Sequence, residues 1–233
     1  MTAETENPLQ NVTFPSNGHQ AHGYLVKPPS GTGPGLIVIQ EWWGLTDQIG
    51  RTADQLAEQG FVCLAPDLFG GRTTHDGDEA GEIMGTLDFG RAAQDLAGAV
   101  DYLLADESVT GKVGAIGFCM GGGFVIALAA QVGDKLSAAV PFYGVVRPDF
   151  DGWASITAPV QGHFAEQDEM TPPNKAREIE QKIRAGGAEA EFFIYAGAGH
   201  AFCNDDNILG TWNPEACELA MGRAVAFLKE RLG

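Results

Sequence analysis

Hydrophobic residues along the chain follow two alternating patterns. Short apolar runs between glycine, proline or polar residues are typical of strands buried on both faces, and apolar residues three and four positions apart are typical of helices. The expected strands, some with their exit loops, are GLIVIQE (35–41), FVCLAPDLF (61–69), KVGAIGF (112–118), SAAVPFYG (137–144), PVQGHFAEQD (159–168) and EAEFFIYAG (189–197). The expected helices cover 46–60, 87–105, 120–131, 172–185 and a C-terminal stripe of Cys217, Met221, Ala224, Val225, Leu228 and Leu232.

The N-terminal segment differs, because polar and apolar residues alternate in NVTF and HQAHGYLVK on either side of the turn-forming PSNG (15–18). This pattern predicts an antiparallel hairpin. Strands that alternate with helices predict an α/β fold, a mostly parallel doubly wound sheet flanked by helices, with the hairpin at one edge. No linker or internal repeat is visible, so we expect a single domain over residues 1–233. Ligands of such sheets bind at the carboxyl ends of the strands.

Charge and motif content narrow the classes of function. The formal net charge of -17 repels phosphates and anionic lipids, so neither a nucleic acid nor a membrane is an expected partner. The segment MTAETENPLQNV lacks the basic and apolar parts of an export signal, and no run approaches the ~18 apolar residues of a membrane span. These features predict a cytoplasmic protein. Without GxGxxG, GxxxxGK[ST] or HExxH, neither a cofactor nor a metal is expected.

The four cysteines, Cys63, Cys119, Cys203 and Cys217, form no CxxC pair. In a chain without an export signal this pattern predicts free thiols and no disulfide. Nothing in the sequence indicates the oligomeric state.

The segment KVGAIGFCMGGG (112–123) carries the first candidate chemistry. It reads as a strand, then Gly-x-Cys-x-Gly, then a helix, which is the context of a nucleophile elbow. Gly117 and Gly121 stand where side chains would collide across such a strained turn. Cys119 is therefore a candidate nucleophile, and a glycine-rich turn with a buried structural cysteine is the alternative.

The order of residues along the chain supplies a second argument, because hydrolases with this elbow carry nucleophile, acid and histidine in that order. Only His163 and His200 follow Cys119, and His163 lies inside an expected strand, so His200 is the better base. The cluster AEQDEM after the same strand offers Glu166, Asp168 and Glu169. We select Asp168 as the acid that orients the imidazole, although solvated loop acids are common.

The motifs GFCMGGG, HFAEQDEMTP and YAGAGHAF, together with IQEWWGL and APDLFGGR, resemble the dienelactone hydrolase family. These carboxymethylenebutenolidase-like enzymes have the α/β-hydrolase fold and a Cys-Asp-His triad. The resemblance covers the chain from about Tyr24 onward and implies that Cys119, Asp168 and His200 are catalytic. It also implies that Glu41 contacts the resting thiol and helps to ionise it.

The expected chemistry follows from the thiolate. A thiol with an ordinary pKa of about 8.5 needs a basic or cationic neighbour, and it gains from a helix N-terminus. The backbone N–H groups of Met120 and Trp42 are the expected oxyanion-hole donors. A thiolate suits activated esters and lactones, because a stabilised leaving group needs little general-acid help, and a thioester acyl-enzyme is expected.

Substrate recognition is less complete in this sequence. The resemblance implies two arginines that hold a substrate carboxylate, and Arg72 matches the first, while Asn204 stands at the second position. An amide brings no charge, so affinity for a carboxylate should be lower. Tyr143 and Phe202 are candidate pocket residues, with core packing as the alternative.

Two classes of function are compatible with these residues. The first is an enzyme that hydrolyses small activated esters or lactones, either dienelactones or a broader range of esters. The second is a non-catalytic ligand-binding protein on the same fold. The combination of three triad residues with Glu41 favours the enzyme.

Overall fold

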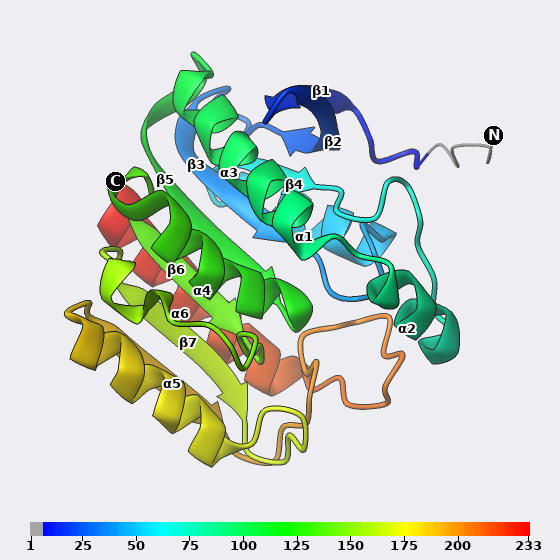
Figure 1. Ribbon diagram of the computed structural model, residues 1–233, viewed down its shortest axis with the longest axis vertical. Helices are drawn as coiled ribbons and strands as arrows, with labels where there is room; N and C mark the ends of the chain where they lie inside the picture. Colours follow the sequence, from blue (N-terminus) through cyan, green and yellow to red (C-terminus); the bar gives the residue numbers. More distant parts are fainter. Residues whose placement is uncertain (1–6) are drawn as a thin grey trace. The chain divides into compact units, whose positions relative to one another are not determined.

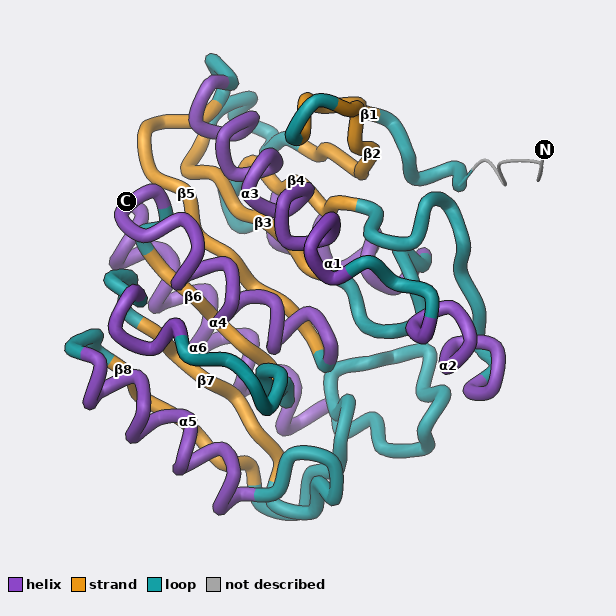
Figure 2. The backbone as a smooth tube through the Cα atoms, viewed as in Figure 1, coloured by secondary structure: helices purple, strands orange, loops and turns teal. Residues whose placement is uncertain are grey.

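The computed structural model describes residues 7–233 (Figures 1 and 2). These residues form two compact units, one that ends at Val113 and one that runs over Gly114–Gly233. That the two units make up one domain over residues 1–233 stays a prediction.

The first unit holds four strands in the order β1-β2-β4-β3. Their bounds are β1 Val12–Ser16, β2 His19–Val26, β3 Gly33–Ile39 and β4 Val62–Pro66. The pairs β1–β2 and β2–β4 are antiparallel and β3–β4 is parallel. The predicted hairpin is confirmed, and its turn places Asn17 and Gly18 at positive φ, the conformation that matches the twist of two-residue hairpins.

Three helices belong to the same unit: α1 Asp47–Glu58, α2 Gly77–Gly85 and α3 Phe89–Ala105. Helix α1 confirms the prediction for 46–60, with Thr46 at the N-cap position and Gly60 at positive φ just beyond its end. The sequence pattern did not predict α2. Only Ala80 and Ile83 of this helix are buried, so its apolar periodicity is too weak to recognise.

The second unit is a parallel sheet in the order β5-β6-β7-β8. Strand β5 (Val109–Phe118) enters it from the first unit, and β6 Ala138–Phe142, β7 Val160–Ala165 and β8 Ala190–Tyr195 follow. Every residue of β6 and β7 is buried, as expected for strands covered on both faces. Helices α4 (Met120–Val132) and α5 (Pro173–Gly186) cover one face and α6 (Pro214–Leu232) the other (Figure 1).

The expected α/β fold, with mostly parallel strands and an antiparallel N-terminal hairpin, is confirmed. The parallel arrangement brings the carboxyl ends of β5, β7 and β8 to one edge of the second unit, and the loops that leave this edge carry Cys119, Asp168 and His200. In the described part of the chain, no helix is long and apolar enough to cross a membrane.

Candidate active site

Cys119 occupies the sharp turn between β5 and α4. Its backbone has φ 53 and ψ -115, a conformation that is costly for a residue with a side chain. The turn is held by hydrogen bonds from the Cys119 N–H to the Phe142 carbonyl and from the Gly122 N–H to the Cys119 carbonyl, each 3.0 Å long. A Cβ atom at Gly117 would collide with the Gly121 backbone, so the first glycine of the motif is a steric requirement.

His200 and Asp168 reach Cys119 from two other loops. His200 Nε2 lies 3.1 Å from Cys119 Sγ, and His200 Nδ1 lies 2.7 Å from Asp168 Oδ2. The Asp168 side chain is fully buried, and its Oδ1 accepts hydrogen bonds from the backbone N–H groups of Met170 and Thr171, each 2.8 Å long. These bonds fix the carboxylate and leave its second oxygen for the imidazole.

In Asp168 and His200, hydrogen bonding shifts the pKa values more than burial does. Burial by itself raises the pKa of the Asp168 carboxyl, but the bonds from His200, Thr171 and Met170 outweigh it and hold the pKa below its usual range. Burial by itself lowers the pKa of His200, but hydrogen bonds with Asp168 and Cys119 raise it to about 10. The imidazole therefore holds a proton readily while it faces the sulfur atom.

Aromatic side chains support the imidazole. The Tyr143 ring packs edge-on against His200 with centroids 5.3 Å apart, and Phe202 packs on Tyr143 at the same separation. Both Tyr143 and Phe202 are fully buried, so these two candidate pocket residues lie among the packed side chains around His200. The Thr211 hydroxyl donates to the His200 carbonyl, a contact that no sequence motif indicated.

A disulfide joins Cys203 to Cys217, which contradicts the prediction of four free thiols. The chain leaves His200, runs through a loop and returns in the first turns of α6, where the two Cα atoms lie 4.9 Å apart. A separation of 14 residues belongs to no recognisable cysteine motif, so only the folded loop brings the two sulfurs together. Cys63, which is buried, and Cys119 are free thiols.

The remaining candidates lie as follows. Met120 is the first residue of α4, where the backbone N–H has no acceptor within the helix. Asn204 is buried, and its side-chain oxygen accepts from the Asp206 N–H. In the first unit, Glu41 and Trp42 follow the end of β3, with Glu41 buried and Trp42 packed on Trp43. Arg72 is exposed in the loop after β4. The roles of these residues stay predictions.

Comparison with known proteins agrees with the motifs. The family model of the dienelactone hydrolase family matches residues 21–232. Protein usf of Aquifex pyrophilus is 34% identical over 230 residues, which is 96% of this chain and 99% of the relative.

Two solved structures under 25% identical share the fold. A dienelactone hydrolase-like promiscuous phosphotriesterase from metagenomic libraries is 24% identical with a TM-score of 0.85, over 95% of this chain and 97% of the other. The dienelactone hydrolase of Anabaena variabilis is 20% identical with a TM-score of 0.69, over 98% and 100%. The family model and the relative confirm the recognition made from the motifs: the chain belongs to the dienelactone hydrolase family and is a hydrolase.

Proposed function

We propose that this member of the dienelactone hydrolase family hydrolyses activated carboxylic esters or lactones through a thioester on Cys119. The observation that carries the proposal is the chain of contacts from Asp168 through His200 to Cys119, with a strained nucleophile at the start of α4. A thiol, an imidazole and a fixed carboxylate in that order are the components of covalent acyl transfer.

In the first half of the reaction, His200 takes the thiol proton and the sulfur attacks the carbonyl carbon. A C–S bond forms and the carbonyl oxygen becomes an oxyanion. When the oxyanion collapses, the bond to the leaving oxygen breaks and the His200 imidazolium supplies a proton to the departing group. The raised pKa of His200 favours the imidazolium, and Asp168 stabilises its charge.

The second half returns the enzyme to its starting state. Neutral His200 takes a proton from a water molecule, and the water oxygen attacks the thioester carbon. The C–S bond breaks, the acid product leaves, and the His200 imidazolium returns its proton to the Cys119 sulfur, which restores the thiol. Asp168 keeps the Nε2 atom of His200 directed at the reacting groups in both halves, because its Oδ2 holds Nδ1.

The oxyanion needs donors at a fixed position. The Met120 N–H is suited to this role because it opens α4 beside Cys119, at the positive end of the helix dipole. The Trp42 N–H is the proposed second donor, and Glu41 is the proposed partner of the resting thiol.

An enol-lactone or aryl ester is the preferred substrate class, because its leaving group is stabilised and needs only partial protonation. Arg72 is proposed to attract a substrate carboxylate. Since Asn204 brings no charge, we expect acceptance of uncharged activated esters as well, which makes a broader esterase the second candidate.

The test is to trap the acyl group. Rapid acid quenching during turnover of p-nitrophenyl acetate, followed by peptide mass spectrometry, should find acetyl on the Cys119 peptide. A Cys119→Ala variant should lose both the label and the activity, and a Cys63→Ala variant should keep both, because Cys63 is the other free thiol.

Turnover without label on Cys119 would contradict the thioester. No turnover of any activated ester would favour the ligand-binding alternative.

A further inference from the structure

The disulfide between Cys203 and Cys217 closes a loop that begins three residues after His200. Cys217 lies in the first turns of α6, and α6 packs against β6 and β7, so this end of the disulfide is attached to the sheet. Cys203 lies in the loop that also carries His200. The covalent bond therefore fixes the chain just beyond His200 to the packed part of the second unit.

Thr211, which lies inside the closed loop 203–217, supports His200 directly. Its hydroxyl donates a hydrogen bond to the His200 carbonyl. The nearby Asn213 donates its N–H to the Phe202 carbonyl at 3.0 Å, and its side chain accepts from the Ala216 N–H at the start of α6 at 3.1 Å. The segment that supports His200 is thus the segment that the disulfide encloses.

Ala201, the residue that follows His200, has a strained backbone. Its φ of 59 is a left-handed conformation that a residue with a Cβ atom adopts at a cost, and only while the chain on both sides is fixed. On one side, His200 is bound to Asp168. On the other side, Phe202 is buried and Cys203 is held by the disulfide. Opening the disulfide removes one of these constraints, so Ala201 relaxes and the direction of the His200 imidazole changes.

The two ends of the disulfide differ in exposure. Cys203 is buried, whereas Cys217 is half-buried, so Cys217 is the end that a dithiol reductant reaches. A thiolate of the reductant attacks the Cys217 sulfur, the S–S bond breaks, and Cys203 leaves as a thiolate. The second thiol of the reductant then displaces Cys217 and forms a cyclic disulfide. The two cysteines take up the two protons and two electrons that the dithiol loses.

We propose that the Cys203–Cys217 disulfide is a reversible redox switch for the hydrolase, which is fully active with the disulfide closed and less active after a dithiol reductant opens it. The switch acts through the position of the His200 imidazole, because Thr211 and Ala201 connect His200 to the closed loop. The inference rests on the proposed function, since ester turnover is the output of the switch.

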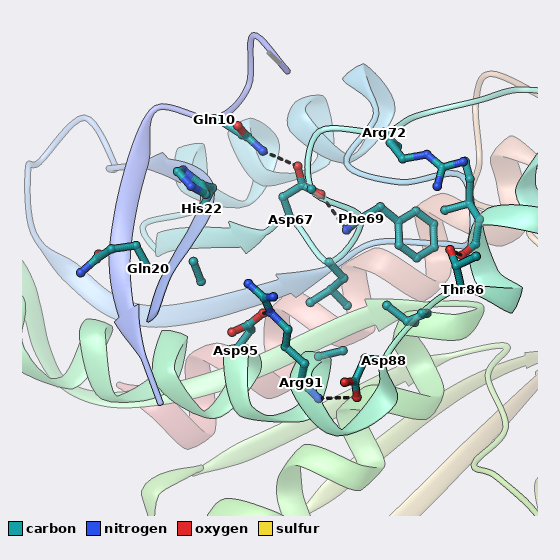
Figure 3. A pocket seen from close by; sticks show the side chains of 16 residues that line it. Gln10, Gln20, His22, Asp67, Phe69, Arg72, Thr86, Asp88, Arg91 and Asp95 are labelled. Atoms are coloured by element: carbon teal, nitrogen blue, oxygen red, sulfur yellow. Dashed lines mark hydrogen bonds and ion pairs between the residues drawn. The ribbon is translucent and has the colours of Figure 1, made fainter. Parts of the chain in front are cut away.

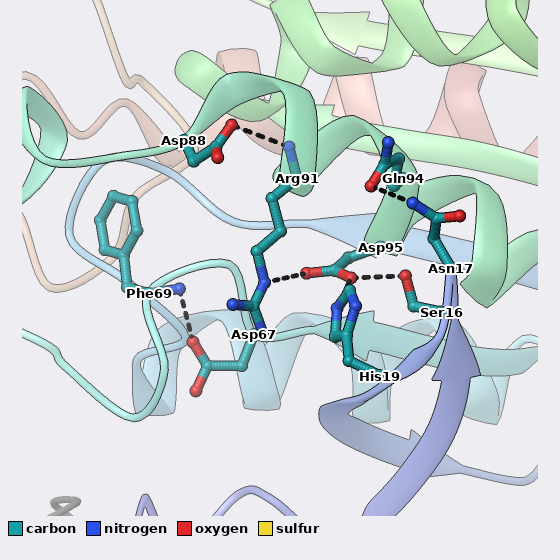
Figure 4. Close-up of polar contacts among 9 residues, drawn as sticks. All are labelled: Ser16, Asn17, His19, Asp67, Phe69, Asp88, Arg91, Gln94 and Asp95. Carbon is teal, nitrogen blue, oxygen red and sulfur yellow. Dashed lines mark hydrogen bonds and ion pairs between the residues drawn. The ribbon is translucent and has the colours of Figure 1, made fainter.

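Two contacts of the first unit contain no sulfur atom and supply a comparison. In the loop after β4, the Asp67 side chain accepts a hydrogen bond from the Phe69 N–H (Figure 3). Between the β1–β2 hairpin and α3, His19 Nε2 lies 2.6 Å from Asp95 Oδ1 (Figure 4). Like His200, His19 is an imidazole beside a carboxylate, but it lies outside the segment that the disulfide closes. His19 is therefore the internal control for the effect of a reductant.

The experiment compares the oxidised and reduced forms of the full-length protein. Dithiothreitol, removed under argon before the assay, gives the reduced form, and mass spectrometry of an alkylated sample counts its thiols. The reduced form should hydrolyse p-nitrophenyl acetate with a kcat/KM at least ~10-fold lower, because small displacements of a catalytic group cost up to ~10²-fold in rate. Reoxidation with oxidised glutathione should restore kcat/KM, with peptide mass spectrometry to verify that Cys119 carries no glutathione.

Two variants separate the disulfide from the other thiols. The double variant Cys203→Ala, Cys217→Ala should have the low kcat/KM of the reduced form and should not respond to dithiothreitol. Cys63→Ala is the matched control, because it removes a free thiol and keeps the disulfide, and it should respond as the natural protein does. Circular dichroism verifies that each form is folded at the assay temperature.

A second readout follows His200 without turnover. In NMR of the ¹⁵N-labelled imidazoles, reduction should shift the His200 resonances and lower the His200 pKa from about 10, because the bond with Asp168 depends on the position of the ring. The His19 resonances should stay unchanged.

Three results would overturn the proposal: equal kcat/KM of the oxidised and reduced forms, unchanged His200 resonances after verified reduction, or an equal shift of the His19 resonances. If neither form turns over any activated ester, the proposed function fails. The NMR comparison then decides by itself whether the disulfide sets the position of His200.

Discussion

Two buried histidines follow Cys119 in the chain, and the structure gives them opposite properties. His163 lies inside β7, fully buried, with its ring stacked on Phe142 at 4.5 Å. His200 lies in the loop after β8, with its ring between Asp168 and Cys119. The pKa of His163 is lowered to about 3, and that of His200 is raised to about 10.

The difference comes from the neighbours, because both rings lose most of their water. Burial lowers the pKa of His163, and the charge of Arg223 lowers it further, while its Nδ1 meets only the neutral Tyr195 hydroxyl at 2.8 Å. His200 instead faces a fixed carboxylate. A buried histidine becomes a proton carrier when an anion offsets its desolvation, and otherwise it stays a neutral core residue.

The largest expected effect is on catalysis, and it separates the two rings. His200→Asn should lower kcat/KM for p-nitrophenyl acetate by about 10³-fold or more, because the proton carrier is lost. His163→Phe should leave kcat/KM within a few-fold. Steady-state kinetics of both variants, with folding checked by circular dichroism, measure the contrast. A large loss in both variants would show that the His163 environment also takes part in the chemistry.

The next prediction concerns the carboxylate of Asp168, which His200 faces and His163 lacks. Asp168→Asn should lower kcat/KM by roughly 10²-fold to 10⁴-fold, because the imidazole loses its orientation and charge partner. It should also lower the pKa of His200, since the bond with Asp168 is the largest influence that raises it. NMR titration of the ¹⁵N-labelled imidazole measures the change. An unchanged pKa of His200 in this variant would show that Asp168 does not raise it.

The third prediction concerns the chain segments that hold the His163 and His200 rings in place. His163 is held by a strand, whereas the loop after His200 is closed by the Cys203–Cys217 disulfide. For a closed loop of this length, loop-closure entropy predicts that the double variant Cys203→Ala, Cys217→Ala loses about 3 kcal/mol of unfolding free energy. Urea denaturation measures it.

Reduction of the natural protein should produce a similar loss, and the double variant should be indifferent to the reductant. Equal stability of all these forms would show that the hydrogen bonds of the loop are sufficient by themselves.

The last prediction concerns the pH dependence of stability. Because the pKa of His163 is lowered from 6.5 to about 3, the unfolded state binds more protons in that window, so stability falls as the pH falls. This group contributes a slope of at most about 1.4 kcal/mol per pH unit. His163→Phe should reduce the acid-side slope measured by denaturation between pH 6.5 and 4. An unchanged slope would mean that His163 titrates normally.

Local patterns were sufficient for most elements and for the choice of candidate residues. The strands, the long helices, the cysteine elbow and the selection of His200 over His163 all followed from short-range pattern and chain order. Helix α2 was not predicted because it buries only Ala80 and Ile83, which gives too weak an apolar pattern. The disulfide was not predicted because two cysteines pair only where the folded chain brings them close together. No residue between Cys203 and Cys217 indicates that the loop folds back in this way.

The amino-acid sequence by itself determined the parallel α/β architecture, the glycine-bound turn at Cys119 and the order of the proposed nucleophile, acid and base. Each of these depends on residues that are close together in the chain or on the order in which they follow one another. Tertiary structure decided the opposite pKa shifts of His163 and His200, and it decided how Thr211 and the disulfide hold the His200 loop. These properties arise from burial and from distances between residues far apart in the chain, which no local pattern contains.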